Sequence, residues 1–444
     1  MRHERLAQSD NLNSLTRHEE IALKRVWAII LRSCGYHIEV SYTEMGSNKY
    51  FTSSFRRDHD DKLAKHSLHP RSETLNGESI MLNSDIRHMR NRAVYFSLEA
   101  GLADDDDVFS FCDHAVHPCL TGFVSEDLHK ALWESCRKDS ADNFILSFLR
   151  VNNFDVEASV KMVAEALDWR INAANVDTIL CQGDAHFLAN SPELTHLLES
   201  NELFIRGRSR DGCPLIFVRT RIHFRRNCPD DDFERLVLLI FEWARLGFDA
   251  RNNISQCHVV FDLTGFSMKN ADFHAMRFVI KTAQMRYPSM CQKVYIHRAP
   301  QVFNIMWKII YPWLKPHVRD IISFTLTYEH LHENISSRYI AKSLGGKASE
   351  APRYVGPHGA SFQRKSPDLN FDCLIAERDD LTARFVHTTV QWIESKDCAE
   401  SRDLLKRRKS LSNDRATNYT QVDPYSRTRG LPDRNGTFDE ASYL

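Results

Sequence analysis

The chain has 444 residues, with 58 Lys and Arg against 59 Asp and Glu, so its formal net charge is −1. Charged residues make up 26% and apolar residues 42%, which excludes collagen-like, coiled-coil and wholly disordered proteins. A near-zero charge also differs from the strongly basic character of nucleic-acid binders, so we expect no nucleic-acid partner. No apolar stretch approaches the roughly 18 residues that cross a bilayer, which predicts no membrane-spanning helix.

The N-terminus and the cysteines indicate the cellular compartment. Residues Met1–Asp10 are polar and lack the apolar core of a secretory signal. The 11 cysteines are scattered without a C-x-x-C pair, which predicts reduced thiols and no metal site. We therefore expect a cytoplasmic protein.

The chain opens with an expected helix in residues 1–40 and continues into a linker. Thr16 and Glu19 have capping-box spacing ahead of an apolar helical stripe. The stripe consists of Leu23, Val26, Trp27, Ile30 and Leu31. Periodicity fails over residues 41–121, which predicts a linker of low order. The acidic run Asp104–Asp107 in this linker is compatible with a hard cation, although a solvated segment is favoured.

A helical module is expected in residues 122–172, and Asp155 is the predicted N-cap of its second helix. Two amphipathic faces indicate it. The first comprises Phe144, Ile145, Phe148 and Leu149, and the second comprises Val156, Val160, Val163, Ala164 and Leu167.

Residues 195–350 alternate between strand and helix patterns, which predicts an α/β domain with a largely parallel sheet. The expected strands are Pro214–Arg219, Cys257–Leu263, Lys293–His297 and Ile321–Leu326. The expected helices are Asp232–Leu246, Asn270–Arg286 and Gln301–Leu314. Within the last of these, Val302–Leu314 is apolar on nearly every face, which is typical either of a core helix or of a mobile flap that meets lipid.

Signatures of catalysis are missing from the sequence. There is no G-x-G-x-x-G, P-loop, G-x-S-x-G or H-E-x-x-H motif. His258 and His297 lie in apolar strands, where a histidine is more often a hydrogen-bonded core residue than a base. We therefore predict that the protein is not an enzyme and has no cofactor other than a bound ligand.

The C-terminal part divides into an extension and a tail. Residues 351–394 are expected to end in a helix at Arg378–Ile393. Residues 395–444 are polar, which predicts a disordered tail. The basic run Lys406–Lys409 is compatible with anionic lipid, but a disordered segment is favoured.

An ordered set of motifs stands out in the sequence. In the helical module the motifs are Asn143–Arg150, Asn153–Val156 and Asp168–Arg170. Downstream they are Asp211-Gly212, Val260–Phe266, Tyr287-Pro288, His297–Pro300 and Leu344–Gly346. Together they resemble the CRAL-TRIO lipid-binding family, in particular its fungal phosphatidylinositol-transfer branch. The resemblance covers residues 122–346, and the helix at Arg378–Ile393 is similar to the C-terminal helix of that branch.

The resemblance implies an α/β cage that encloses one phospholipid or other hydrophobic lipid. It also implies a gate helix at Val302–Leu314 that opens during transient contact with a membrane. Strand parity places one set of side chains on the cavity side of the sheet, and the gate helix caps them. These expected lipid-binding residues are Cys257, Val259, Phe261, Val294, Ile296, Phe303, Trp307, Ile310, Ile322 and Phe324.

The positions that bind the headgroup in the family differ here. Phosphatidylinositol-binding members carry a basic pair, a Glu, a Thr and a Lys at these positions. This chain has Asn152, Asn153, Ser289, Val318 and Ile321 instead. The resemblance therefore implies a phosphatidylinositol-transfer-like protein with a degenerate headgroup site. The alternative is a CRAL-TRIO interaction module that acts as a scaffold and transfers no lipid.

Overall fold

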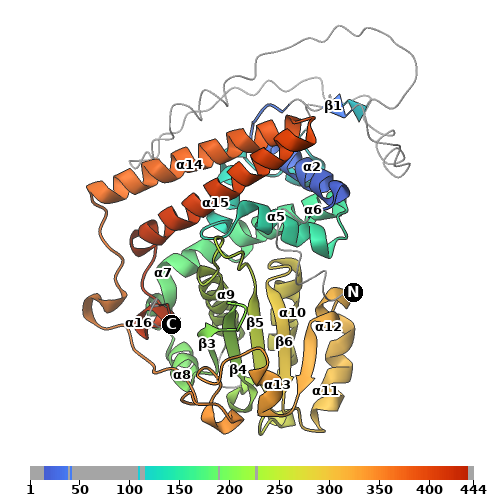
Figure 1. Ribbon diagram of the computed structural model, residues 1–444. Helices are drawn as coiled ribbons and strands as arrows, with labels where there is room; N and C mark the ends of the chain where they lie inside the picture. The colour runs from blue at the N-terminus through green and yellow to red at the C-terminus, as the bar shows by residue number, and fades with distance from the viewer. Residues whose placement is uncertain are drawn as a thin grey trace, which may run out of the picture.

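The computed structural model describes residues 15–38, 41–42, 109–110, 116–188, 191–225 and 229–438. Figure 1 shows two layers, with a helical part above an α/β part. The acidic run Asp104–Asp107 and most of the expected linker lie outside the described residues. The linker contributes one short antiparallel pair of strands, β1 (Ser41–Tyr42) and β2 (Phe109–Ser110). Within the described residues no helix combines the length and apolarity that crossing a bilayer requires.

The helical part packs around α2 (Arg17–Ser33). The predicted capping box of this helix is confirmed, because Thr16 Oγ1 accepts the Glu19 N–H at 3.3 Å and Glu19 Oε2 accepts the Thr16 N–H at 2.8 Å. The helices beneath it are α4 (Ser125–Ser135), α5 (Ala141–Val151) and α6 (Val156–Asp168). Asp155 caps α6 as predicted, by accepting the Ala158 N–H at 2.9 Å.

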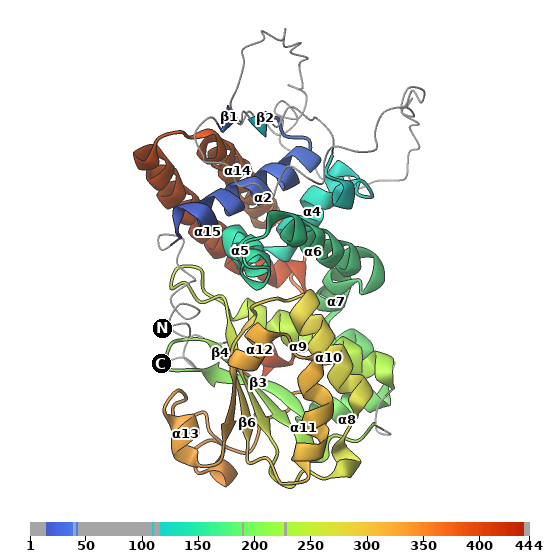
Figure 2. The same ribbon diagram turned by 90° about the vertical axis from the view of Figure 1, so that its right-hand side faces the viewer.

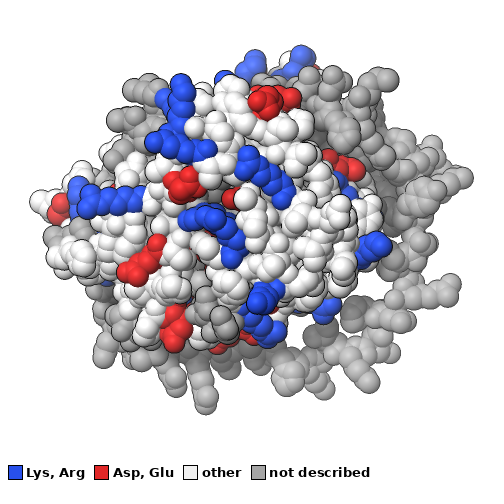
Figure 3. All heavy atoms as spheres, turned by 90° about the horizontal axis from the view of Figure 1, so that it is seen from below, with Lys and Arg blue, Asp and Glu red and all other residues white. Residues whose placement is uncertain are grey.

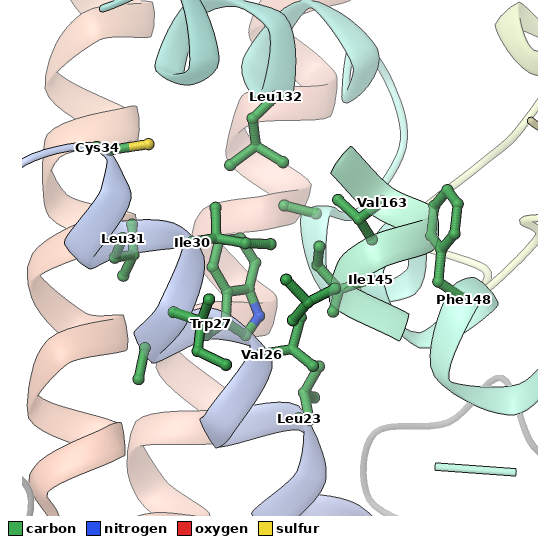
Figure 4. Packing of buried hydrophobic residues seen from close by; sticks show 14 of the residues in the cluster. Leu23, Val26, Trp27, Ile30, Leu31, Cys34, Leu132, Ile145, Phe148 and Val163 are labelled. Carbon is green, nitrogen blue, oxygen red and sulfur yellow. The ribbon is translucent and has the colours of Figure 1, made fainter. Parts of the chain in front are cut away.

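The core of this part is built on the apolar stripe of α2, all of which is buried. Figure 4 shows Val26 and Ile30 directed toward Ile145 of α5. Trp27 is fully buried, and its indole N–H donates to Asp142 Oδ1 at 2.8 Å. This hydrogen bond satisfies the one polar atom of a large buried ring.

The expected disordered tail from Ser395 is wrong for Cys398–Ser426, which forms the long helix α15. It packs along α14 (Leu369–Glu394), which begins earlier than the helix predicted at Arg378–Ile393. The fully buried Arg408 of α15 pairs with Asp142 at 2.5 Å and lies 4.1 Å from the centroid of the Trp392 ring. Leu405, Leu411 and Val422 of α15 are buried as well, but the many charged residues between them hid this face from hydropathy. Because Arg408 is buried, the run Lys406–Lys409 does not present four free cations.

Two helices and a π-helical turn connect the helical part to the sheet. The turn is Trp169–Ala173, and it is followed by α7 (Val176–Leu188) and α8 (Pro192–Ser200). At the other end of the chain, α16 (Leu431–Arg434) returns to this connection, where Arg434 pairs with Asp184 of α7 at 2.6 Å.

The α/β part contains a five-stranded sheet in the order β3-β4-β5-β6-β7. The strands are β3 (Leu203–Arg208), β4 (Pro214–Arg219), β5 (Cys257–Asp262), β6 (Cys291–His297) and β7 (Ile322–Thr325). Within this five-stranded sheet only the β3–β4 pair is antiparallel. The predicted α/β fold with a mostly parallel sheet is thus confirmed.

The crossover helices all cover one face of the sheet, as Figure 2 shows. They are α9 (Asp230–Leu246), α10 (Phe273–Met285) and α11 (Phe303–Ile310). Parallel crossovers are right-handed, so successive steps in one direction place every helix on the same side. The expected helix Gln301–Leu314 is divided, because the 3-10 turn Tyr311–Trp313, which contains Pro312, and α12 (Pro316–Asp320) follow α11.

The opposite face is covered by α13 (Tyr328–His332) and the loop after it, through Leu331, Ile335 and Ile340. His258 and His297 are both fully buried and hydrogen-bonded on this face, as predicted, and burial lowers the pKa of His297 to about 4. The remaining short 3-10 helices are Pro118–Leu120, Thr220–Ile222, Met268–Asn270, Lys342–Leu344 and Gly359–Phe362.

Candidate functional site

A cavity of about 590 Å³ lies between the sheet and helices α9, α10 and α11. Its volume lies within the range of roughly 300–1,000 Å³ found for small-molecule sites. The walls are mostly apolar, and the cavity exists because the helices stand on one face of a sheet whose inward side chains are largely β-branched or aromatic. An apolar chamber of this size suits a hydrophobic ligand.

Eight of the ten residues predicted to bind lipid line this cavity. Five come from the sheet and three from α11, namely Val259, Phe261, Val294, Ile296, Ile322, Phe303, Trp307 and Ile310. Alternation along each strand brings them together, because residues two apart share one face and the parallel register aligns neighbouring strands.

The two other predicted wall residues lie elsewhere. Cys257 begins β5 and is fully buried in the core, with its sulfur 4.0 Å from that of Cys291. Phe324 lies on the edge strand β7 and is 53% exposed, with its ring edge-on to Trp307 at a centroid separation of 5.0 Å. The alternation of side chains along the strand placed both residues on the expected face of the sheet, but both lie where the sheet continues beyond the cavity.

Sequence reasoning missed the wall that α9 and α10 supply. Its members include Phe233, Val237, Ile240, Met276, Val279 and Ile280. They follow helical spacings of three and four residues, so the same periodicity that predicted the helices could have identified their inward faces.

At the amino edge of the parallel strands, the cavity meets three of the headgroup-equivalent residues. Ser289, Val318 and Ile321 line it there. Asn152 and Asn153 do not. The Asn152 amide donates to its own helix at Phe148 O, 2.9 Å away. Residues 150 and 151 of α5 reach the cavity instead.

A second, smaller cavity of about 60 Å³ adjoins this edge, between the helical part and the sheet. Arg150, Ser289 and Arg286 line it, and Arg286 stacks over the Trp169 ring at 5.6 Å. Trp169 is half-buried and packs edge-on against Tyr287, so its ring has a packing role at this junction.

At the carboxyl edge, an acidic cluster contacts the same cavity. His223 lies between Glu202 and Asp272, with its Nδ1 2.6 Å from Glu202 Oε1 and its Nε2 3.3 Å from Asp272 Oδ2. Burial acts to lower the pKa of His223, but the two carboxylates outweigh it and raise that pKa above its usual value. Since both ring nitrogens are engaged, His223 is not positioned to act as a general base.

A buried ionic cluster, here called the interface network, joins the helical part to the cavity wall. Its members are Arg137, Asp139, Arg170, Asp177, Glu242, Arg245 and Tyr287. Burial alone would raise the pKa of Glu242, but the guanidinium groups of Arg170, Arg245 and Arg137 hold it well below the usual range. Tyr287 lines the cavity and donates its hydroxyl to Glu242 at 2.8 Å, so the network fixes this part of the wall.

The chain is similar to proteins of one family. The family model described as CRAL/TRIO domain matches residues 198–346. The phosphatidylinositol transfer protein CSR1 of Eremothecium gossypii is 34% identical over 310 residues, covering 69% of this chain and 71% of that protein. The CRAL-TRIO domain-containing protein C3H8.02 of Schizosaccharomyces pombe is 27% identical over 429 residues, covering 95% of this chain and 91% of that protein. The crystal structure of Sfh5 aligns at 17% identity with a TM-score of 0.39, covering 47% of this chain and 72% of that one.

Proposed function

The chain belongs to the CRAL/TRIO family, as its motifs predicted, and from this we propose that it is a lipid-transfer protein that encloses one lipid and exchanges it at membranes. The observation that carries the proposal is the apolar cavity of about 590 Å³ behind α11. A relative of the chain is named a phosphatidylinositol transfer protein, which supports a phospholipid as the class of cargo.

The energetics of such a protein require no catalytic group. Removing about thirty methylenes from water is worth roughly 24 kcal/mol, at about 0.8 kcal/mol each. A lipid in a bilayer is already out of water, so its free energy changes little when it moves into an apolar cavity. The protein lowers the barrier to transfer by keeping the acyl chains dry between membranes.

The two faces of α11 suit the role of a gate. Phe303, Met306 and Ile310 are buried against the cavity, whereas Ile305 and Ile309 are 59% and 42% exposed. Exposed aliphatic side chains on a helix that closes an apolar chamber favour docking on a lipid surface. Figure 3 shows Lys and Arg side chains interspersed with Asp and Glu among uncharged surface at the lower end of the α/β part, and these cations suit a reversible contact with anionic membranes.

The headgroup site is proposed to select only weakly for phosphatidylinositol. Ser289, Val318 and Ile321 meet at the amino edge, where none of them supplies a charge. Charge-assisted hydrogen bonds are worth about 1.5–3 kcal/mol each, so losing two or three weakens discrimination by a factor on the order of a hundred or more. The restored-headgroup variant is defined as Ser289→Glu, Val318→Thr and Ile321→Lys together. It restores the carboxylate, the hydroxyl and the ammonium group that phosphatidylinositol-binding members carry at these positions.

The proposal is tested by extracting the purified full-length protein with organic solvent and identifying lipids by mass spectrometry. We expect about one lipid per chain in the wild type. The variant Ala283→Trp, which adds an indole to the α10 wall of the cavity, should lose most of it. Thr417→Trp, on the exposed side of α15, is the matched control and should keep its lipid.

An empty wild-type protein that is folded and fails to take up lipid from vesicles would contradict transfer and favour a scaffold. Equal lipid content in the Ala283→Trp variant and the wild type would show that the lipid lies outside this cavity.

A further inference from the structure

The face of the sheet opposite the lipid cavity carries a group of metal-binding side chains at its amino edge. Asp211 and Cys213 lie in the hairpin between β3 and β4, and His258 is the second residue of β5. One ligand atom from each of the three lies within 4.8 Å of the other two. Carboxylate oxygen, thiolate sulfur and imidazole nitrogen are the donors that zinc prefers in proteins.

A fourth donor, Gln292, lies among them. Its Oε1 is 2.7 Å from His258 Nε2 and 3.3 Å from Cys213 Sγ, and His258 Nε2 is 3.7 Å from Asp211 Oδ2. Zinc bonds of about 2.0–2.3 Å in a tetrahedron place ligand atoms roughly 3.3–3.7 Å apart. The four side chains therefore need only small movements to surround one ion.

A β-bulge aims Gln292 at this position. Strands β5 and β6 pair Cys257 with Cys291 but His258 with Lys293, so Gln292 is an extra residue opposite no partner. Bulges redirect a side chain and are common beside functional sites. Without the bulge, the amide at position 292 would not sit between the thiol and the imidazole.

The surroundings are polar and held in place. Ser209 Oγ accepts the Cys213 backbone N–H at 3.0 Å and also contacts the Asp211 carboxylate. Within the described residues, two buried polar atoms beside the cluster have no hydrogen-bond partner, the hydroxyl of Tyr295 and Nδ1 of His258. Native proteins satisfy nearly all such atoms, so this region is polar enough to hold a further bound species.

We propose that Asp211, Cys213, His258 and Gln292 bind a divalent cation of the zinc class. Cys213 ligates as thiolate, and its proton leaves to solvent as the metal–sulfur bond forms. His258 ligates through Nε2 and keeps its ring proton on Nδ1. The Asp211 side chain is 46% exposed and gives access from solvent. The ion ties the β3–β4 hairpin to β5 and β6, behind the wall that holds the lipid.

The test uses the purified full-length chain, stripped with chelator and then titrated with Co²⁺, whose spectrum reports thiolate ligation. We expect one equivalent to bind with a sulfur-to-cobalt absorption band that Zn²⁺ abolishes by competition. The band should disappear in Cys213→Ser, and affinity should fall at least tenfold in Asp211→Asn, an exposed position where folding is not at risk. Cys181→Ser removes an exposed thiol elsewhere and should leave the band unchanged.

Absence of the band from the wild-type protein, or its persistence in Cys213→Ser, overturns the site. Metal bound without the band would belong to surface histidines, of which the chain has many, and overturns the site equally. Lipid content measured on the same samples separates this inference from the proposed function, because Asp211, Cys213 and His258 do not line the cavity and only Gln292 of the group borders it.

Discussion

Replacing Glu242 by Gln removes the central anion of the interface network. Arg137, Arg170 and Arg245 balance three carboxylates in this network, and Glu242 is the one that contacts all three cations, with distances of 2.8, 3.0 and 3.2 Å. The glutamine keeps the shape but leaves one buried positive charge uncompensated, and its NH₂ group faces guanidinium donors. Breaking a buried pair in this way costs about 3–5 kcal/mol, a large part of the roughly 5–15 kcal/mol that stabilises a domain.

The pH dependence gives this prediction a second measurement. The pKa of Glu242 in the folded protein lies well below its usual range because Arg170, Arg245 and Arg137 outweigh the effect of burial. A group with a lowered folded pKa stabilises the protein above its unfolded pKa, which is about 4.3 for glutamate. This contribution is lost as pH falls through the folded pKa. The difference between wild type and Glu242→Gln should therefore be full at pH 7 and shrink below about pH 4.

Urea unfolding followed by circular dichroism at several pH values measures both effects. Glu234→Gln on the same helix is the matched control. It should change stability by less than about 0.5 kcal/mol, because burial raises the pKa of Glu234 and its carboxylate gains little from folding. A Glu242→Gln variant with the wild-type midpoint at pH 7 would refute the view that the network stabilises the junction of the two parts.

Four further features lead to predictions. Ile305→Asp with Ile309→Asp should reduce vesicle binding and lipid exchange together while circular dichroism stays native. The control Leu369→Asp, at an even more exposed position on α14, should reduce neither, and unchanged exchange in the double variant would exclude α11 as the gate. The restored-headgroup variant should raise loading of labelled phosphatidylinositol over phosphatidylcholine in competition, whereas strong selectivity in the wild type would contradict a degenerate site. Trp169→Ala should cost less than the roughly 3–5 kcal/mol of a fully buried tryptophan, measured by urea unfolding, since the ring is only half-buried. His223→Gln should lower stability most at acidic and neutral pH, because the pKa of His223 is raised in the folded protein and the resulting stabilisation is lost as pH rises through that pKa. A stability difference that stays constant from acidic to alkaline pH would argue against a protonated His223.

Local patterns in the sequence determined most of the elements and the part of the cavity wall that the sheet and α11 supply. Thr16 and Glu19 fixed the beginning of α2, since a capping box needs only residues three apart. Alternation along β5 and β6 placed Val259, Phe261 and Val294 on the cavity face, because side chains in a strand point to opposite sides in turn. These features depend on neighbours in the chain, so they could be predicted without knowledge of the fold.

Tertiary structure alone decided the features that depend on distant partners. The largely polar helix α15 packs through Arg408, which meets Asp142 and the Trp392 ring, and through buried apolar residues such as Leu405. No local pattern contains these distant contacts. The limits of the cavity leave out Cys257, which is buried in the core, and Phe324, which lies exposed on the edge strand β7. The group around Cys213 likewise draws on a hairpin and two separate strands, one of them bulged. The sequence thus determined which faces are apolar, and the packing of distant segments decided what each face encloses.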